Sequence, residues 1–156
     1  MRREMQVTKV MFLCTGNTCR SQMAEGFAKA LGKGLIASHS AGLMPAGVVH
    51  PRAITVMKEM GIDISTQRSK AIDADLLEKM DVIVALCGNA EASCPMTPPE
   101  IRRMHWPIDD PVHAVGSEEG IMEAFRKARD EIRGKIDELI HSFIGVHNNV
   151  KWPDAE

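Results

Sequence analysis

Short apolar runs alternate along the chain with segments of helical periodicity, and this alternation limits the possible folds more than any other feature. The run 82–86 (VIVAL) is continuously apolar, as strands buried in parallel sheets are. The alternation predicts an α/β class: a single domain with a four-stranded parallel sheet flanked by helices on both faces. The predicted strands are 10–13, 35–40, 82–86 and a short one at 104–106. The predicted helices are 21–31, 51–60, 73–80 and 118–143, with Ser117 as the cap of the last one.

Chain length indicates the number of domains, and net charge indicates which classes of partner are favoured. The chain has 156 residues, near the mode for one domain, so we expect one domain over 1–156, with a folded core over about 8–144 and a loosely held tail over about 145–156. With 19 basic and 21 acidic side chains the net charge is −2, which favours neither a nucleic acid nor a membrane as partner. No apolar run approaches a membrane span or a signal peptide, so a cytoplasmic location is expected.

One loop stands between the first predicted strand and the first predicted helix. It begins at Cys14 and continues with Thr15, Gly16, Asn17, Thr18, Cys19, Arg20 and Ser21. A tight loop that enters a helix N-terminus directs backbone N–H groups at one point, where an oxyanion fits. Arg20 can hold two oxyanion oxygens, the same field favours the thiolate of Cys14, and Ser21 can donate to the sulfur. The pattern therefore predicts a nucleophile beneath a tetrahedral anion, although a Cys-x5-Arg spacing also occurs by chance.

Attack on a tetrahedral oxyanion needs a proton for the oxygen that leaves. Asp109 and Asp110 precede Pro111 in the irregular, proline-rich stretch 88–111. Such a sequence is most often a turn, but together with the cysteine loop it supplies a candidate general acid. We favour Asp110, the residue next to the rigid proline.

Four cysteines in a cytoplasmic chain are expected to be reduced, and therefore inert, metal-binding or catalytic. No histidine stands at a usual ligand spacing, so we predict no metal site. Cys87 follows a predicted strand and Cys94 comes seven residues later, with a small, polar and movable segment between them. Hydrolysis of an ester needs one thiolate, whereas two-electron reduction of an oxyanion needs further thiols. Three thiols favour reduction, a core thiol at Cys87 remains the alternative, and Cys19 is predicted to be a bystander.

Several motifs together resemble the thioredoxin-coupled arsenate reductases, which share the fold of the low-molecular-weight protein tyrosine phosphatases. The resemblance covers roughly residues 9–143. Its motifs are 14–26 (CTGNTCRSQMAEG), 40–42 (SAG), 57–65 (MKEMGIDIS), 86–88 (LCG), 94–99 (CPMTPP), 105–106 (HW) and 109–111 (DDP). The loop is common to both groups, and Cys87 with Cys94 favours the reductases. The phosphatases usually carry tyrosines after the Asp-Pro, and this chain contains none.

The resemblance implies a role for each site residue. Cys14 would attack arsenate, Cys87 would attack Cys14, and Cys94 would take over the disulfide. Arg20 and the loop would hold arsenate, or phosphate or sulfate as analogues, and Asp110 would supply the proton. Thioredoxin would reduce the final disulfide, with glutaredoxin as another possible reductant. No tightly bound cofactor is implied, and we expect a monomer.

Two other functions fit the same residues. The alternatives are a low-molecular-weight protein tyrosine or small-phosphoester phosphatase, which would use Cys14 and Asp110, and a non-catalytic oxyanion or redox sensor.

Some family members bind potassium behind the loop through residues that match Asn17, Glu25 and Ser40. Their fourth ligand is an aspartate where this chain has Lys70. Our hypothesis is that the Lys70 ammonium replaces the ion and supports the loop, whereas a solvated surface lysine is the alternative.

Overall fold

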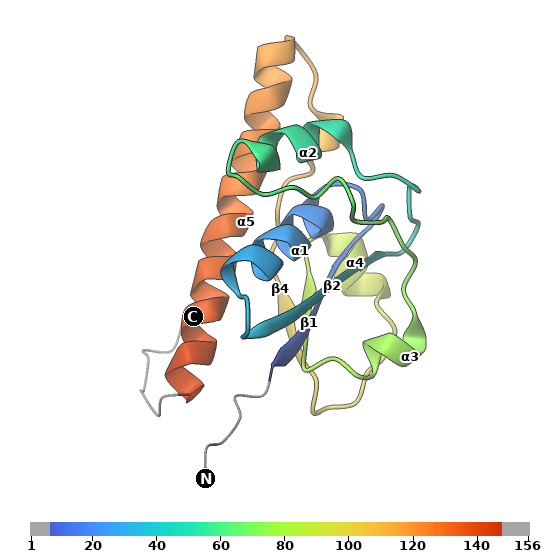
Figure 1. Cartoon of the computed structure of the whole chain (residues 1–156). Helices are drawn as coiled ribbons and strands as arrows, with labels where there is room; N and C mark the ends of the chain where they lie inside the picture. The colour runs from blue at the N-terminus through green and yellow to red at the C-terminus, as the bar shows by residue number, and fades with distance from the viewer. Residues whose placement is uncertain (1–6, 148–156) are drawn as a thin grey trace.

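Four parallel strands form the centre of the protein, in the order β2-β1-β3-β4 (Figure 1). The computed structural model describes residues 7–147. The strands are β1 (Thr8–Cys14), β2 (Ile36–Gly42), β3 (Val82–Ala85) and β4 (Arg102–His105). This confirms the predicted four-stranded parallel sheet. The fourth strand begins two residues before its predicted position and ends one residue earlier.

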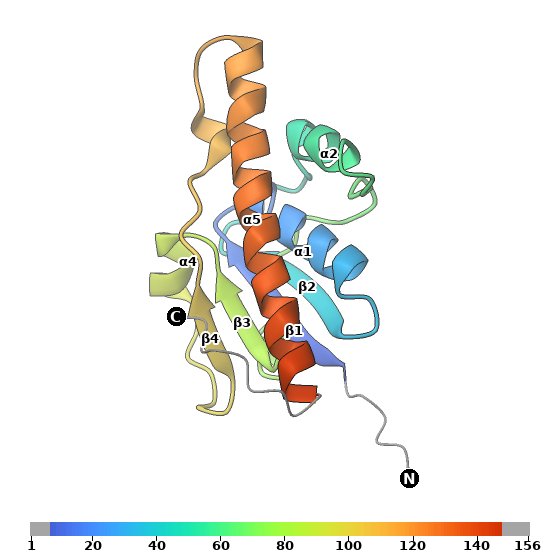
Figure 2. The ribbon, with the colours of Figure 1, turned by 90° about the vertical axis from the view of Figure 1, so that its left-hand side faces the viewer.

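Helices flank this sheet. They are α1 (Arg20–Leu31), α2 (Pro51–Lys58), α3 (Ala74–Leu77), α4 (Gly88–Ser93) and α5 (Glu118–His147), with a 3₁₀ turn η1 (Pro111–His113). α1, α2 and α5 pack against one another (Figure 2). β2 lies on one side of β1, and β3 and β4 lie on the other. Right-handed crossovers in opposite directions place α1 on one face of the sheet and α4 on the other.

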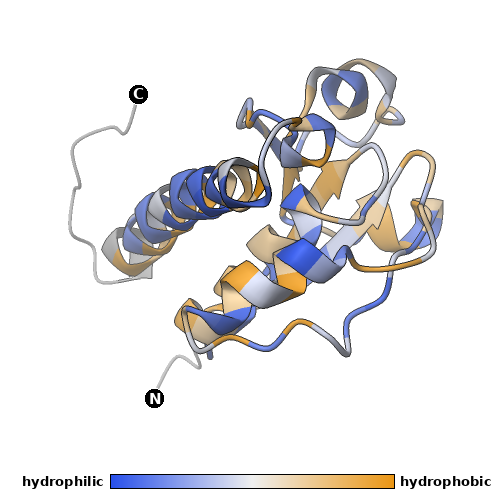
Figure 3. Cartoon of the chain, turned by 90° about the horizontal axis from the view of Figure 1, so that it is seen from above, coloured by the Kyte–Doolittle hydropathy of each residue, from blue (hydrophilic) through white to orange (hydrophobic). Residues whose placement is uncertain are grey.

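The core lies between the sheet and the helices. Residues Val10 to Leu13 of β1 are each at most 1% exposed, because both faces of this central strand are covered. Figure 3 shows hydrophobic residues, in orange, on the sheet, whereas the long helix α5 presents many hydrophilic residues, in blue, to the outside. Phe125, Ile132 and Ile136 on the inner side of α5 are buried, as the spacing of its apolar residues predicts.

Two helices differ most from the prediction, whereas the start of α5 agrees with it. Residues 88–93, expected to be irregular, form α4, whereas the helix expected over 73–80 is the single turn α3. α5 begins at Glu118, directly after Ser117, whose hydroxyl accepts from the backbone N–H of Gly120, as a capping residue does. α5 continues to His147, and the rest of the predicted tail, 148–156, lies outside the described residues.

Within residues 7–147, no helix combines the length and the apolar character that crossing a membrane requires.

Candidate active site

The loop from Cys14 to Arg20 lies at the carboxyl end of β1, where ligands gather in open parallel sheets. The carbonyls of Thr15, Gly16 and Thr18 accept hydrogen bonds from the backbone of residues 44, 46 and 50, so they point away from the loop centre. In a trans peptide the N–H of the following residue points the opposite way. The loop therefore directs several of its N–H groups inward, as an oxyanion site requires.

The sulfur of Cys14 is buried beside the hydroxyl of Ser21. Cys14 Sγ lies 2.8 Å from Ser21 Oγ, the contact that the sequence predicted. Ser21 Oγ also accepts from Asn17 Nδ2 at 2.7 Å, and Asn17 Nδ2 donates to Ser40 Oγ at 3.0 Å. Asn17 has φ +46°, in the left-handed region that few residues other than glycine adopt. The hydrogen bonds of its side chain hold it there.

Arg20 and Asp110 face each other across the mouth of the loop. Arg20 Nη1 donates to the carbonyl of Ile108 at 3.0 Å, and Nη2 lies 3.3 Å from Asp110 Oδ2. The structure thus brings a carboxyl from 90 positions later in the chain to the loop, as predicted. The other carboxylate oxygen of Asp110, Oδ1, accepts a hydrogen bond from the backbone N–H of Val112 at 3.0 Å. His113, a residue that the sequence did not single out, approaches Asp110 Oδ2 to 3.5 Å.

The second pair of cysteines lies at the two ends of α4. Cys87 Sγ is 3.4 Å from Thr15 Oγ1, so this thiol adjoins the residue that follows Cys14. It also accepts from the backbone N–H of Ala90 at 3.4 Å and thereby caps α4. Cys94 ends α4 and is only partly buried. Burial raises the pKa of the Cys94 thiol, and the nearby Arg103 guanidinium opposes that rise.

Cys19 differs from the other three cysteines. It precedes α1, and its side chain is buried, with 2% exposure. Burial, reinforced by the negative charge of Asp110, raises the pKa of this thiol far above its usual range. A raised pKa disfavours the thiolate, which is the reactive form of a cysteine.

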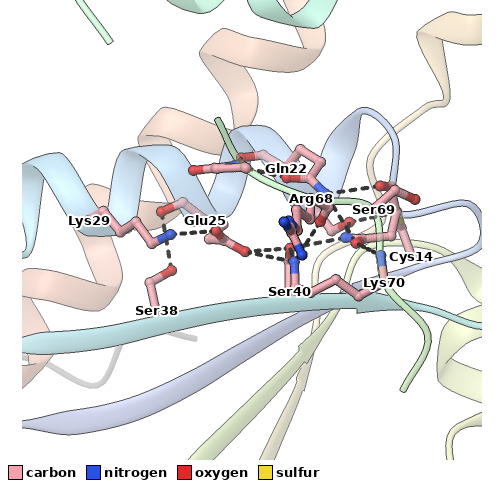
Figure 4. A network of polar contacts seen from close by, with 12 residues as sticks. Cys14, Gln22, Glu25, Lys29, Ser38, Ser40, Arg68, Ser69 and Lys70 are labelled. Carbon is pink, nitrogen blue, oxygen red and sulfur yellow. Dashed lines mark hydrogen bonds and ion pairs between the residues drawn. The ribbon is translucent and has the colours of Figure 1, made fainter. Parts of the chain in front are cut away.

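Behind the loop, Glu25 lies between two lysines (Figure 4). Its side chain is only 5% exposed. Lys29 Nζ is 2.6 Å from Glu25 Oε2, and Lys70 Nζ is 3.4 Å from Oε1. Lys70 Nζ also lies 3.3 Å from Ser40 Oγ and donates to the carbonyl of Arg68 at 2.7 Å. An ammonium group thus stands among the oxygens that the resemblance assigns to a potassium ion, so these residues do not fit that ion.

Two residues that the sequence did not single out join the loop to its surroundings. Gln22 Nε2 donates to both oxygens of Asn17, each at 3.0 Å, and to the carbonyl of Arg68 at 2.8 Å. Ser69 Oγ donates to the carbonyl of Gly16 at 3.1 Å. A glutamine on the buried side of a helix is a signal that could have drawn attention to Gln22, whereas nothing near Ser69 in the sequence indicated its contact.

Comparison with known proteins agrees with this site. The sequence matches the family described as low molecular weight phosphotyrosine protein phosphatase over residues 9–150. The chain belongs to this family. It is 50% identical over 130 residues to an arsenate reductase of Bacillus subtilis (strain 168). The aligned residues cover 83% of this chain and 93% of that relative. Within the phosphatase family, the chain therefore belongs with the arsenate reductases.

Solved structures extend this result to the fold. An arsenate reductase in the phosphate-binding state superposes with a TM-score of 0.72 at 40% identity, over 88% of this chain and 99% of that one. A thioredoxin-dependent arsenate reductase of Corynebacterium glutamicum gives a TM-score of 0.72 at 27% identity, over 88% of this chain and 62% of that one. The four-stranded architecture is thus the fold of the low-molecular-weight phosphatase family.

Proposed function

We propose that the protein reduces arsenate to arsenite by passing a disulfide from Cys14 to Cys87 and on to Cys94. The observation that carries the proposal is the position of Cys87, whose sulfur lies 3.4 Å from Thr15 Oγ1, beside the oxyanion loop. A phosphatase of this fold has no use for a thiol there, because hydrolysis regenerates its single thiolate. Relatives named arsenate reductase support the same assignment.

The first step joins sulfur to arsenic. Arg20 and the inward N–H groups of residues 15–21 hold the oxyanion, and the Cys14 thiolate attacks the arsenic atom. An oxygen leaves as water when Asp110 supplies a proton, so the product is a thiol–arsenate adduct in which arsenic is still pentavalent. Ser21, which contacts the sulfur, helps to hold the thiolate before the attack.

The second step transfers the electrons. The Cys87 thiolate attacks the Cys14 sulfur, and the electron pair of the sulfur–arsenic bond passes to arsenic, which leaves as trivalent arsenite. Cys94 then attacks Cys87, a Cys87–Cys94 disulfide forms, and Cys14 is released as a thiolate. In total, two thiols are oxidised and one arsenate is reduced by two electrons.

The attack of Cys94 on Cys87 requires α4 to unfold. Cys87 and Cys94 flank this helix, and seven steps of about 1.5 Å separate their Cα atoms by roughly 10 Å. A disulfide needs Cα atoms about 4.4–6.8 Å apart. The six-residue helix is short and packs mainly against β1 and β3, so the cost of unfolding it is small compared with unfolding a longer helix.

We also propose the partners of this cycle. A thioredoxin reduces the Cys87–Cys94 disulfide in the cytoplasm, by analogy with the thioredoxin-dependent relative, and a glutaredoxin is the competing reductant. The partly exposed position of Cys94 favours such an exchange. No resident cation is required behind the loop, because the Lys70 ammonium occupies that place.

A Cys87→Ser variant tests the relay. With arsenate, thioredoxin, its reductase and NADPH, we expect the variant to lose multiple-turnover reduction, since no thiol can release arsenite from Cys14. Its hydrolysis of p-nitrophenyl phosphate, which needs only Cys14 and Asp110, should persist at the native rate. Turnover of arsenate by Cys87→Ser at the native rate would refute the relay.

A Cys14→Ser variant separates the remaining alternatives. We expect it to lose both reactions, because both begin at this sulfur. A native protein that hydrolyses the phosphoester but does not reduce arsenate would favour the phosphatase alternative, for which the Arg20–Asp110 pair is equally suited.

A further inference from the structure

Lys70 touches the network behind the active-site loop at two points. Its backbone N–H donates to Asn17 Oδ1 at 2.8 Å. Its ammonium contacts the carbonyl of Arg68, Ser40 Oγ and Glu25 Oε1 (Figure 4). The network continues from Ser40 through Asn17 and Ser21 to the sulfur of Cys14.

The backbone contact fixes the direction of these hydrogen bonds. A backbone N–H can only donate, so the atom of Asn17 that meets Lys70 is its carbonyl oxygen. The amide nitrogen of Asn17 therefore faces the other way, and its two hydrogens go to Ser21 Oγ at 2.7 Å and Ser40 Oγ at 3.0 Å.

The side-chain contacts fix the direction of the remaining hydrogen bonds in this network. Ser40 Oγ receives hydrogens from Asn17 and from the Lys70 ammonium, so its single proton points to Glu25 Oε1 at 2.6 Å. Ser21 Oγ receives the other hydrogen of Asn17, so its proton is left for Cys14 Sγ. A hydroxyl that donates to sulfur favours the thiolate over the thiol.

The two lysines act on different oxygens of the same buried carboxylate. Lys29 pairs with Glu25 Oε2, which faces away from the loop network, whereas Lys70 pairs with Oε1, the oxygen that accepts from Ser40. Their side chains are similarly exposed, 52% for Lys29 and 41% for Lys70. Removing either side chain takes one positive charge from Glu25, but of the two only the Lys70 side chain contacts Ser40 Oγ, the atom that accepts from Asn17 Nδ2.

We propose that Lys70 is a positioning residue for Cys14: its ammonium, built into the chain in place of a bound monovalent cation, keeps the Ser40–Asn17–Ser21 hydrogen bonds oriented so that the last hydroxyl donates to the nucleophilic sulfur. The proposal rests on Cys14 as the nucleophile of the proposed function. It adds a residue, more than 50 positions from Cys14, that sets the reactivity of the thiol without touching the substrate.

The matched pair Lys70→Met and Lys29→Met tests the proposal. The readout is the rate at which iodoacetamide alkylates Cys14 as a function of pH, followed by mass spectrometry at single-residue resolution. For Lys70→Met we expect the midpoint of this profile to rise by about half to one pH unit, which makes alkylation below the midpoint about three- to tenfold slower. Lys29→Met should keep the native midpoint, and Lys70→Arg should recover most of it. Arg20 and Asp110, the charged groups that also face the loop, are the same in every variant.

A second variant guards against a folding defect. Ser40→Ala cuts the same network but leaves Lys70 in place, and the midpoint should rise as it does in Lys70→Met. Equal shifts in Lys70→Met and Lys29→Met would reduce the effect to charge on Glu25 and overturn the proposal. A native midpoint in Lys70→Met would overturn it as well, whatever Ser40→Ala shows. Alkylation needs neither arsenate nor a reductant, so its result is independent of whether the proposed function holds.

Steady-state arsenate reduction offers a second readout of the same proposal. Replacing potassium by tetramethylammonium at constant ionic strength should leave the native rate unchanged, because the positive charge is already in place. Strong activation of the native protein by potassium would overturn the proposal.

Discussion

At the scale of single residues, Asp110 is held in place by Arg20 and by a backbone N–H. The Arg20 guanidinium lies 3.3 Å from Asp110 Oδ2, and the N–H of Val112 donates to the other oxygen. A bound oxyanion competes with Asp110 for Arg20, because both are negative. Oxyanion binding therefore weakens the contact between Arg20 and Asp110 and frees the Asp110 carboxyl to face the bound anion.

Replacing Asp110 by Asn should remove this proton donor and leave the binding site intact. We expect kcat for arsenate reduction to fall by about 10²–10⁴-fold, the usual contribution of a general acid. The Kd for phosphate should not rise, since the variant removes a negative charge from the mouth of the loop. Asp109→Asn is the matched control, because Asp109 is an exposed neighbour outside these contacts. An unchanged kcat in Asp110→Asn would exclude the role.

Residues near one another in the sequence were easier to predict than distant ones. The contact of Cys14 with Ser21 follows from a loop that enters a helix, and spacing alone indicated it. The contacts of Gln22, Arg68 and Ser69 depend on how the segment 65–72, which has no regular structure beyond one bridge to Gly42, lies against the loop. That path has no periodic signal, so the sequence could not reveal it.

At the scale of secondary structure, α2 begins with an uncommon cap. His50 Nδ1 accepts from the backbone N–H of Arg52 at 3.1 Å, and the imidazole packs 4.9 Å from the ring of Phe125 on α5. A neutral imidazole can accept this hydrogen bond and a protonated one cannot. Burial lowers the pKa of His50, helped by Arg52 and opposed by the charge of Asp110.

This cap makes stability sensitive to acid. Because the folded protein binds a proton at His50 less readily than the unfolded chain does, stability is lost as the pH falls below the ordinary histidine pKa of about 6.5. His50→Asn should keep the cap and remove the titration. Urea denaturation at pH 7.5 should give similar stability for the two proteins, and at pH 5 the variant should retain about 1 kcal/mol more than the native protein. Parallel pH dependence would contradict this account.

Short elements were the least predictable. α4 contains Gly88 and Asn89, both poor helix formers, and is only six residues long, so its sequence indicated a movable loop. It forms because Cys87 caps its first turn and buried Ala90 packs into the core. The packing of Ala90 is a tertiary effect, and a cysteine is not a usual capping residue. The long helix α5 is predictable from the sequence alone, since its apolar spacing continues for many turns.

At the scale of the whole protein, the sheet order assembles the site. β1 and β3 are neighbours and parallel, so the residues that follow them, Thr15 and Cys87, meet at one edge. The alternation of elements predicted the parallel sheet, and the strand ends predicted that Cys14 and Cys87 would lie close together. The position of Asp110 depends on the irregular path after β4, and only the chemistry of the loop and the family resemblance pointed to it.

An occupied oxyanion site should stabilise the entire fold. A ligand that binds only the native state at 100 times its Kd adds about 2.7 kcal/mol to the free energy of unfolding. We therefore expect phosphate to raise the Tm by several degrees, compared with sodium chloride at equal ionic strength. Arg20→Met should abolish most of this increase, since it removes the guanidinium at the loop mouth. A Tm that responds equally to both salts would argue against specific binding.

Because Cys87 and Cys94 lie at the two ends of α4, turnover can be followed by hydrogen exchange in this helix. If Cys87 and Cys94 are joined once for every arsenate reduced, this helix is dismantled and rebuilt once per turnover, while the catalytic loop is left in place. Amide protons of residues 88–93 would then exchange with solvent in step with catalysis. Deuterium uptake by this one segment, recorded while the substrate lasts, would count the chemical cycles without any label on substrate or reductant.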